Sequence, residues 1–441
     1  MNLVESAQDI FLYALDAVMP KHLLERRIII SGDILTLDSL QVDLQAYRNV
    51  FLIGAGKAGA AMASVMENLL GPRLTEGICI VKYGHTLPLK KVKLIEAGHP
   101  IPDEAGMKGT RELVELAQKA TAQDIVFCVI SGGGSALLIY PGEGISLQDM
   151  QILSSALLKA GANIHELNTV RKHLSRVKGG RLAQYLAPAR TITLLISDVI
   201  GDSLDVIASG PTVPDTSTFD DAIQVLRKYS LLDKIPISII QLLEKGNRGE
   251  IEETPKVGNP VFNTITNWII GNNQYALQAA AEKAKLSGFN PCILSSGLFG
   301  ESRYNAQSLV AIAREVVQSG YPVCPPACLI MGGETTVTVR GQGKGGRCTE
   351  FALSAAMAMK PADRFVILAA GTDGTDGPTD AAGAIATPET MPNARKMGLD
   401  PSHYLTNNDS YTFFKNVGNL LVTGPTLTNV MDIMLAVISD Q

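Results

Sequence analysis

The stretch NVFLIGAGKAGAAMASVMENLL, residues 49–70, joins an apolar run, a glycine-rich turn and a helical pattern. It predicts a strand over Asn49–Ile53 and a helix over Ala58–Leu70. The glycines of GAGKAG expose backbone N–H groups at the start of that helix, which is a favourable place for an anion. Lys57 inside this turn can neutralise a transferring phosphoryl group. The alternative is a surface lysine on a tight strand–helix turn.

The same order of strand, loop and helix recurs along the chain. Further apolar strands are predicted at Gly77–Val81, Asp124–Ile130 and Thr191–Ser197. Continuous apolar strands indicate a sheet that is covered on both faces. Repeated strand–loop–helix units predict an α/β fold with a doubly wound parallel sheet, in which ligands bind at the carboxyl ends of the strands.

A second α/β region follows a change in composition. Asp233–Pro260 is rich in glycine, proline and charge, so it is predicted to connect two domains, 1–240 and 241–441. A chain of 441 residues is too long for one ordinary core, which agrees with two domains. The elements expected in the second domain are strands at Thr266–Ile270, Pro291–Ser295, Ala327–Met331, Thr335–Val339 and Phe365–Ala370, and helices at Asn273–Ser287, Glu301–Ser319 and after GKGGR.

Composition restricts the class of partner. The net charge of −5 leaves no broad basic surface for nucleic acid or an anionic membrane. The N-terminus has no basic start before an apolar core, and no apolar run reaches transmembrane length. We therefore expect a soluble cytoplasmic protein that acts on small molecules, with most of its six cysteines buried as free thiols. A homodimer is compatible with this composition, which does not determine the oligomeric state.

Two further segments of the first region are candidates for binding anions. SGGGSALL, residues 131–138, follows a predicted strand, and its three glycines can form a concave nest of N–H donors. A tight packing turn is the alternative. NTVRKHLSRVKGGRLA, residues 168–183, concentrates positive charge in an acidic chain, and Arg171 is its candidate for an anionic substrate. A solvated basic face is the alternative here.

Acidic residues on loops are the candidate bases and metal ligands. Asp198 lies in SDVIGD after a predicted strand and can accept a hydroxyl proton or hold Mg²⁺, with N-capping of the next segment as the alternative. Asp373 and Asp376 lie on the glycine and threonine turns of GTDGTDGPTDAAG, which are typical of hard-cation ligands or of plain Asx turns.

A glycine-rich loop in the second region carries the remaining candidates. Residues 332–350, GGETTVTVRGQGKGGRCTE, place Glu334, Lys344 and Arg347 ahead of a predicted helix. A planar guanidinium among glycines suits a clamp that closes on phosphate. The alternative is an ion pair between Arg347 and Glu350 on the same helix.

Taken in order, GAGKAG, SGGGSALL, NTVRKHLSRVKGGRLA, ISDVIGDSLDVIASGPT, GGET, GKGGR and GTDGTDGPTDAAGA resemble the class II bacterial glycerate kinase family over most of the chain. The resemblance implies an N-terminal Rossmann-like domain and a C-terminal MOFRL domain, with the active site in a cleft between them. It also implies phosphorylation of D-glycerate by ATP with Mg²⁺, giving 2-phosphoglycerate, with Lys57 and Arg347 as essential cations. Leu427 departs from the family pattern, which has glycine there.

The resemblance leaves two alternatives open, an NAD(P)H-dependent hydroxypyruvate reductase and a sugar-phosphate sensor. For the kinase, the predicted catalytic residues are Lys57, Arg347 and Asp198, and the predicted metal ligands are Asp373, Asp376 and Glu334. The predicted nucleotide- and substrate-binding residues are Gly54, Gly56, Ser131, Gly132, Gly133, Gly134, Ser135, Arg171 and Lys344.

Overall fold

The computed structural model describes residues 2–440, which form two compact units. The N-terminal unit is Leu23–Ile270, and the C-terminal unit consists of the residues up to His22 and those from Gly271 onward. This division differs from the predicted boundary at residue 240, because the chain stays in the N-terminal unit up to Ile270. In addition, the first helix, α1 (Leu3–Ala17), packs on the sheet of the C-terminal unit. Within the described residues, no helix is long and apolar enough to cross a membrane.

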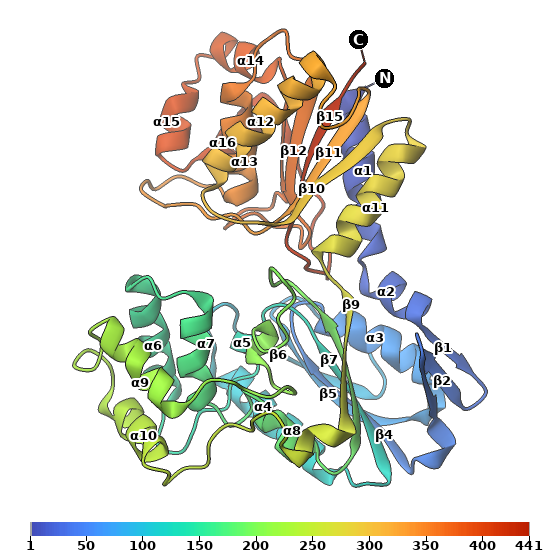
Figure 1. Ribbon diagram of the computed structural model, residues 1–441, viewed down its shortest axis with the longest axis vertical. Helices are drawn as coiled ribbons and strands as arrows, with labels where there is room; N and C mark the ends of the chain where they lie inside the picture. Colours follow the sequence, from blue (N-terminus) through green and yellow to red (C-terminus); the bar gives the residue numbers. More distant parts are fainter. Residues whose placement is uncertain (1, 441) are drawn as a thin grey trace. The chain divides into compact units, whose positions relative to one another are not determined.

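The N-terminal unit is built on a six-stranded sheet with the order β6-β5-β4-β7-β8-β9 (Figure 1). Strands β4 to β8 form parallel pairs. From β4 the following strands β5 and β6 are added toward one edge of the sheet, whereas from β7 the following strands β8 and β9 are added toward the other edge. This is the topological switch point of a doubly wound fold. The strands are β4 (Asn49–Ala55), β5 (Leu74–Lys82), β6 (Val92–Ala97), β7 (Asp124–Ile130), β8 (Arg190–Ile196) and β9 (Ile265–Gly271).

Helices cover this sheet and also form a separate helical cluster with its own apolar core. The helix α9 illustrates why these elements form. Thr218 and Asp221 make a reciprocal capping box at its start, and its apolar residues recur at helical spacing and are buried. The helices are α2 (Pro20–Arg27), α3 (Gly59–Leu70), α4 (Glu104–Lys119), α5 (Gly134–Leu137), α6 (Leu147–Lys159), α7 (Ile164–His173), α8 (Arg181–Leu186), α9 (Phe219–Lys228) and α10 (Ile237–Asn247). A small antiparallel sheet stands between α2 and α3 in the chain, formed by β1 (Ile28–Ser31), β2 (Ile34–Leu37) and β3 (Leu40–Asp43).

The prediction that Asp233–Pro260 connects the two domains is wrong. Most of its first half is α10, whose Leu243 is fully buried in the core of the helical cluster. Gly246 lies so close to Phe219 that an added Cβ would come within 2.4 Å of its ring. These glycines and prolines therefore serve close packing and turns within the N-terminal unit. The predicted strand at Thr266–Ile270 also belongs to this unit, as β9 at the edge of its sheet.

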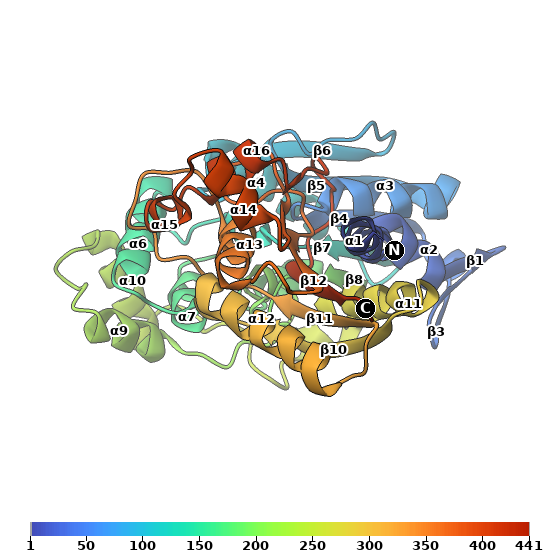
Figure 2. The same cartoon turned by 90° about the horizontal axis from the view of Figure 1, so that it is seen from above.

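The C-terminal unit contains a mixed six-stranded sheet with the order β10-β11-β15-β12-β13-β14. Only β10 and β11 pair in parallel, and the other pairs are antiparallel. Figures 1 and 2 show α1 and α11 on one face of this sheet and α12 and α13 on the other. The strands are β10 (Asn290–Leu298), β11 (Ala327–Gly333), β12 (Phe365–Gly371), β13 (Gly383–Ala386), β14 (Leu420–Leu421) and β15 (Asp432–Ile438). The helices are α11 (Asn273–Leu286), α12 (Ser302–Ser319), α13 (Arg347–Ala358), α14 (Thr390–Lys396), α15 (Pro401–Thr406) and α16 (Ser410–Val417).

The predicted fold class, two α/β domains with a doubly wound parallel sheet in the first, is confirmed. The predicted strand at Thr335–Val339 is wrong, because that segment forms only an isolated bridge at Thr336 with Glu301. The sequence prediction also missed β15, a fully buried strand at the centre of the second sheet. Its continuous apolar pattern, DIMLAVI, is the signal that could have revealed it.

Leu427 adopts a left-handed backbone with φ of +59°. This conformation costs a residue with a Cβ about 1–2 kcal/mol, and glycine avoids that cost. Glycine loses about 0.5–1 kcal/mol through greater freedom in the unfolded chain. We therefore expect Leu427→Gly to be more stable than Leu427→Ala, which loses the same side chain but keeps the strain. Thermal melting of the two variants checks this, and a less stable glycine variant would contradict it.

Candidate functional site

The two glycine loops predicted to bind anions lie side by side at the switch point. The Lys57 N–H donates to the carbonyl oxygen of Gly132 at 2.8 Å, and the Ala58 N–H donates to Ser131 Oγ at 3.0 Å. Gly56 makes this approach feasible, because its φ is +142° and an added Cβ would lie 2.0 Å from Ser131 Oγ. The loops after β4 and β7 are thus joined into one backbone surface.

The side chain of Lys57 lies next to the second of these loops. A Cβ placed on Gly133 would be 3.3 Å from Lys57 Cγ. The N–H groups of Gly132 and Gly133 have no protein acceptor among residues 2–440. Adjacent unused N–H groups beside an ammonium form a surface that attracts anions. The two loops Gly54–Lys57 and Ser131–Ser135, each predicted to bind an anion, are thus in contact in the fold, whereas their role stays a prediction.

A cavity of about 250 Å³ opens beside the second loop. Gly133, Ser135, Arg171 and Lys178 are among the residues that line it. Lys178 is buried, and its Nζ donates to the carbonyl oxygens of Ser135 and Leu138. The lysine therefore fixes the turn that follows the glycines.

The electrostatics of this cavity favour an anion. Neither Arg171 nor Lys178 forms an ion pair with an acid in the described part of the chain. Burial lowers the pKa of Arg171 to about 10. Burial, with a smaller contribution from the positive charge of Arg171, lowers the pKa of Lys178 to about 7. Each cation would be stabilised by a negative ligand, because nearby opposite charge favours the charged form.

The rest of the basic run from residue 168 has structural partners. Lys172 Nζ lies 3.2 Å from Asp205 and 3.1 Å from Asp215, and His173 Nε2 lies 2.9 Å from Glu253. The sequence pattern does not distinguish these paired cations from Arg171 and Lys178, because the pairing depends on tertiary packing. Arg171, which was predicted to bind the substrate, lines the cavity, and its binding role stays a prediction. Lys178 was missed because the spacing of six basic residues does not reveal which one is buried.

Asp198 lies two residues after the end of β8 and is partly buried. Its alternative role as a helix cap is not observed for the next helical turn, Ile207–Ser209, whose N-cap is Val206. Asp198 thus remains a candidate for the acceptor of a proton, at the same carboxyl edge of the parallel sheet as the glycine loops.

In the C-terminal unit, Arg347 begins α13 and is held by two carboxylates. Its Nε and Nη2 lie 2.5 and 3.0 Å from the two oxygens of Asp432, and its Nη1 lies 2.7 Å from Glu334. Asp432 is buried, whereas the Glu334 side chain is 46% exposed. The alternative pair with Glu350 is not formed, since Glu350 pairs with Arg303 at 2.8 Å.

This arrangement keeps Arg347 charged and fixed. Burial opposes the charged form, but the carboxylates of Asp432 and Glu334 together raise the pKa of Arg347. The bidentate contact with Asp432 also sets the plane of the guanidinium. Sequence reasoning missed Asp432, because a single acid ahead of an apolar strand carries no motif.

The loop before Arg347 is packed rather than open. The Lys344 N–H donates to Asp409 at 2.9 Å, while the Lys344 side chain is exposed. A Cβ on Gly345 would lie 2.3 Å from Ser410 Oγ. The glycines therefore allow the loop to lie against the segment before α16. The role of Lys344 in binding stays a prediction.

The predicted metal ligands do not form a preformed cluster. Among the described residues, no three acidic, histidine or cysteine side chains gather as a metal site. Asp376 is buried, and it accepts from the N–H groups of Cys348 and Thr349 at 3.0 and 2.7 Å and from Thr349 Oγ1 at 2.6 Å. Asp373 accepts from the Thr375 N–H at 3.1 Å in an Asx turn. These contacts make Asp376 the anchor of the first turn of α13.

Asp376→Asn should destabilise the protein by about 1–3 kcal/mol. Both carboxylate oxygens of Asp376 accept hydrogen bonds, whereas the NH₂ group of an asparagine amide cannot accept one. Burial raises the pKa of Asp376 to about 6, but three hydrogen bonds favour its charged form at neutral pH. Thermal melting measures the loss, and Asp373→Asn, in an exposed turn, is the matched control. A variant of wild-type stability with an altered Mg²⁺ requirement would instead support the predicted metal role.

The chain combines two features. The first is a doubly wound sheet whose two glycine loops meet at the switch point, and the second is a mixed α/β unit that presents a fixed arginine. This combination defines a class of two-domain α/β proteins. Two family models match this chain, the domain of unknown function DUF4147 over residues 6–244 and the MOFRL family over residues 327–432. The chain belongs to the class II glycerate kinase family, as its motifs predicted.

Three similar proteins extend over most of the chain. A glycerate 2-kinase from Pyrococcus horikoshii is 42% identical, over 97% of this chain and 96% of its own. A protein from Agrobacterium vitis, provisionally named hydroxypyruvate reductase, is 43% identical over 87% of this chain and 85% of its own. The crystal structure of a glycerate kinase from Thermotoga maritima superposes with a TM-score of 0.86 at 42% identity, over 99% of each chain.

Proposed function

We propose that this protein transfers the γ-phosphoryl group of ATP to D-glycerate and forms 2-phosphoglycerate. The observation that carries the proposal is the 250 Å³ cavity beside the glycine loops, where Arg171 and Lys178 have no acidic partner among residues 2–440. Glycerate is a small anion, and its carboxylate matches the two cations that line this cavity. The glycerate kinases among the relatives support the same reaction.

In this reaction, a hydroxyl oxygen of glycerate forms a bond to the γ-phosphorus, and the bond from that phosphorus to the β–γ bridging oxygen breaks. The hydroxyl proton passes to a base, for which Asp198 is the candidate. Lys57 and the N–H groups of Gly132 and Gly133 would stabilise the charge on the phosphoryl oxygens, and Arg347 would add a second cation. The location of this site in a cleft between the domains stays a prediction.

The side chains fit a magnesium ion that arrives with the nucleotide better than a resident one. Mg²⁺ commonly takes one or two carboxylates together with substrate phosphates and water, which requires no protein cluster. Asp373 and Glu334 are the candidate protein ligands, whereas the oxygens of Asp376 already accept three hydrogen bonds. When bound, the ion would neutralise charge on the β- and γ-phosphates.

A paired assay tests the function directly. We expect ADP release that depends on D-glycerate, and no oxidation of NADH or NADPH with hydroxypyruvate. The second reaction is the alternative that the Agrobacterium vitis relative's name suggests. The ³¹P NMR spectrum identifies the product, because phosphorus on the 2-oxygen couples to one methine proton and phosphorus on the 3-oxygen to a methylene pair. Hydroxypyruvate reduction without ADP release would overturn the proposal.

The KM for glycerate should rise roughly tenfold between pH 7 and 9, because Lys178 loses its charge above a pKa of about 7. The folded-state pKa of Lys178, about 7, lies below its ordinary value of 10.5. At a pH between these two pKa values, the unfolded chain therefore binds more protons than the folded protein. Stability contributed by Lys178 therefore rises with pH over that window while anion binding weakens. In Lys178→Arg, which stays charged, the KM should be flat. An equal rise in that variant would refute the role of Lys178.

A further inference from the structure

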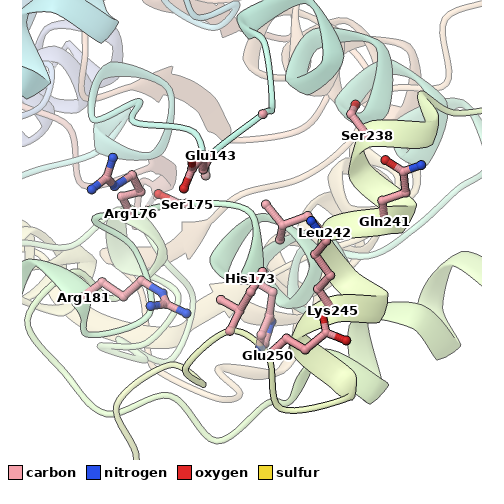
Figure 3. A pocket seen from close by; sticks show the side chains of 13 residues that line it. Glu143, His173, Ser175, Arg176, Arg181, Ser238, Gln241, Leu242, Lys245 and Glu250 are labelled. Atoms are coloured by element: carbon pink, nitrogen blue, oxygen red, sulfur yellow. The ribbon is translucent and has the colours of Figure 1, made fainter.

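The N-terminal unit contains a second, larger cavity of about 610 Å³, which the proposed reaction does not use. It lies between α10 and the segment that follows α7, as Figure 3 shows. This volume is within the range of pockets that bind small molecules. The residues that line it include Glu143, Ser175, Arg176, Arg181, Gln241 and Lys245.

Three basic side chains, two from the segment that leads from α7 into α8 and one from α10, give this cavity a positive character. Arg176 follows α7, Arg181 begins α8 and Lys245 lies on α10. Two acids, Glu143 and Glu250, also line it, but Glu250 pairs with Arg248 at 2.6 Å. The lining thus carries an excess of positive charge in a chain whose net charge is −5.

Arg181 provides an independent indication of a ligand. Its Nη2 donates to the carbonyl oxygen of Glu252 at 2.8 Å, whereas its Nε is buried without an acceptor among the described residues. Burial lowers the pKa of Arg181, so the surrounding protein only partly compensates its charge. In Figure 3 its guanidinium extends toward the middle of the cavity. Buried donors in native proteins are nearly always paired, which leaves a bound acceptor as the missing partner.

The other side chains indicate the chemistry of the ligand. Ser175, Ser238 and Gln241 offer hydroxyl and amide groups, and Leu242 and Ile251 offer apolar contact. Arginine forks and lysine recognise phosphate, and hydroxyl and amide groups recognise alcohols. We propose that this cavity binds a small phosphorylated polyhydroxy compound, separate from glycerate and ATP.

The cavity shares no lining side chain with the proposed glycerate site. Arg171 and Lys178 line the smaller cavity, while Arg176 and Arg181, from the same segment, line the larger one. This separation allows binding to be tested independently of the kinase reaction. Neither Arg176 nor Lys245 belongs to the residues proposed to bind glycerate or ATP.

Calorimetric titration of the full-length protein tests the proposal, with glucose 6-phosphate as the probe and glucose as its uncharged match. We expect glucose 6-phosphate to bind at about millimolar concentration or below and glucose not to bind. The double variant Arg176→Gln/Lys245→Gln should lose at least about tenfold in affinity, because two charge-assisted contacts are removed. Both side chains are exposed, so the fold should be retained, which melting verifies.

Two further variants locate the binding. Lys159→Gln removes an exposed charge from α6, away from the cavity lining, and should bind like the wild type. Lys57→Ala should also bind the probe normally, because Lys57 is outside this cavity. The proposal is overturned if the wild type does not bind glucose 6-phosphate, if the double variant binds it as tightly, or if Lys57→Ala abolishes binding. The Lys57 outcome would place the probe at the phosphoryl site and leave the kinase proposal intact.

Discussion

Arg347→Ala should lower kcat by roughly 10³–10⁵-fold, the range known for arginines that stabilise a transferring phosphoryl group. Charge in that transition state is spread over three oxygens, so a planar guanidinium with several donors fits it better than a point charge. The bidentate contact with Asp432 holds Arg347 in one orientation before substrates bind. Preorganised charge of this kind stabilises the transition state without reorganisation during the reaction.

The exposed partner, Glu334, is the one that can be exchanged. Asp432 is buried and takes Nε and Nη2, whereas the partly exposed Glu334 takes Nη1. A phosphoryl oxygen could replace Glu334 at Nη1 without breaking the pair with Asp432. Glu334 would then be released to a metal on the nucleotide, which agrees with its predicted role as a ligand.

A matched variant separates catalysis from stability. Arg347→Ala alone leaves Asp432 buried without its partner, which costs about 3–5 kcal/mol in comparable pairs. The double variant Arg347→Ala/Asp432→Asn removes that buried charge and should recover much of the stability but none of the activity. Steady-state kinetics with melting curves measure both effects. A folded variant that keeps most of its kcat would rule out the catalytic role of Arg347.

The sequence was sufficient for the local parts of the fold. Continuous apolar strands such as Asp124–Ile130 appear as predicted, and both glycine loops follow them. The order of strands in each sheet depends on contacts between distant residues, which no local pattern specifies. The same limitation explains the error at Asp233–Pro260, because the burial of Leu243 and Gly246 depends on their packing against α9.

The candidate site shows a similar division. Lys57 and Arg347 are recognisable from the sequence because glycine-rich loops surround them. Their partners are not recognisable, since Asp432 lies 85 residues after Arg347. Lys178 belongs to a run of basic residues. In that run, Lys172 pairs with two acids, whereas Lys178 donates to backbone carbonyl oxygens. Which cation needs a ligand thus depends on the tertiary neighbours of each side chain.

Lys57→Ala should lower kcat by about 10²–10³-fold, as expected for the loss of one preorganised donor from a phosphoryl site. The loop should keep its shape in this variant, because its link to the second loop is the backbone N–H of Lys57, which donates to Gly132. The contact of His85 Nδ1 is likewise to the Lys57 carbonyl oxygen, at 3.1 Å. The substitution therefore removes the ammonium and leaves both backbone contacts in place.

Lys57→Arg is the matched control, since it keeps the charge but changes its shape and reach. We expect it to recover part of the lost kcat. ADP release measured over ranges of ATP and glycerate separates kcat from KM, and an interaction formed only in the transition state lowers kcat with little change in KM. If Lys57→Ala turns over within about threefold of the wild type, the ammonium does not act on the transferring group. A rise in the KM for ATP with unchanged kcat would instead assign Lys57 to ground-state binding of the nucleotide.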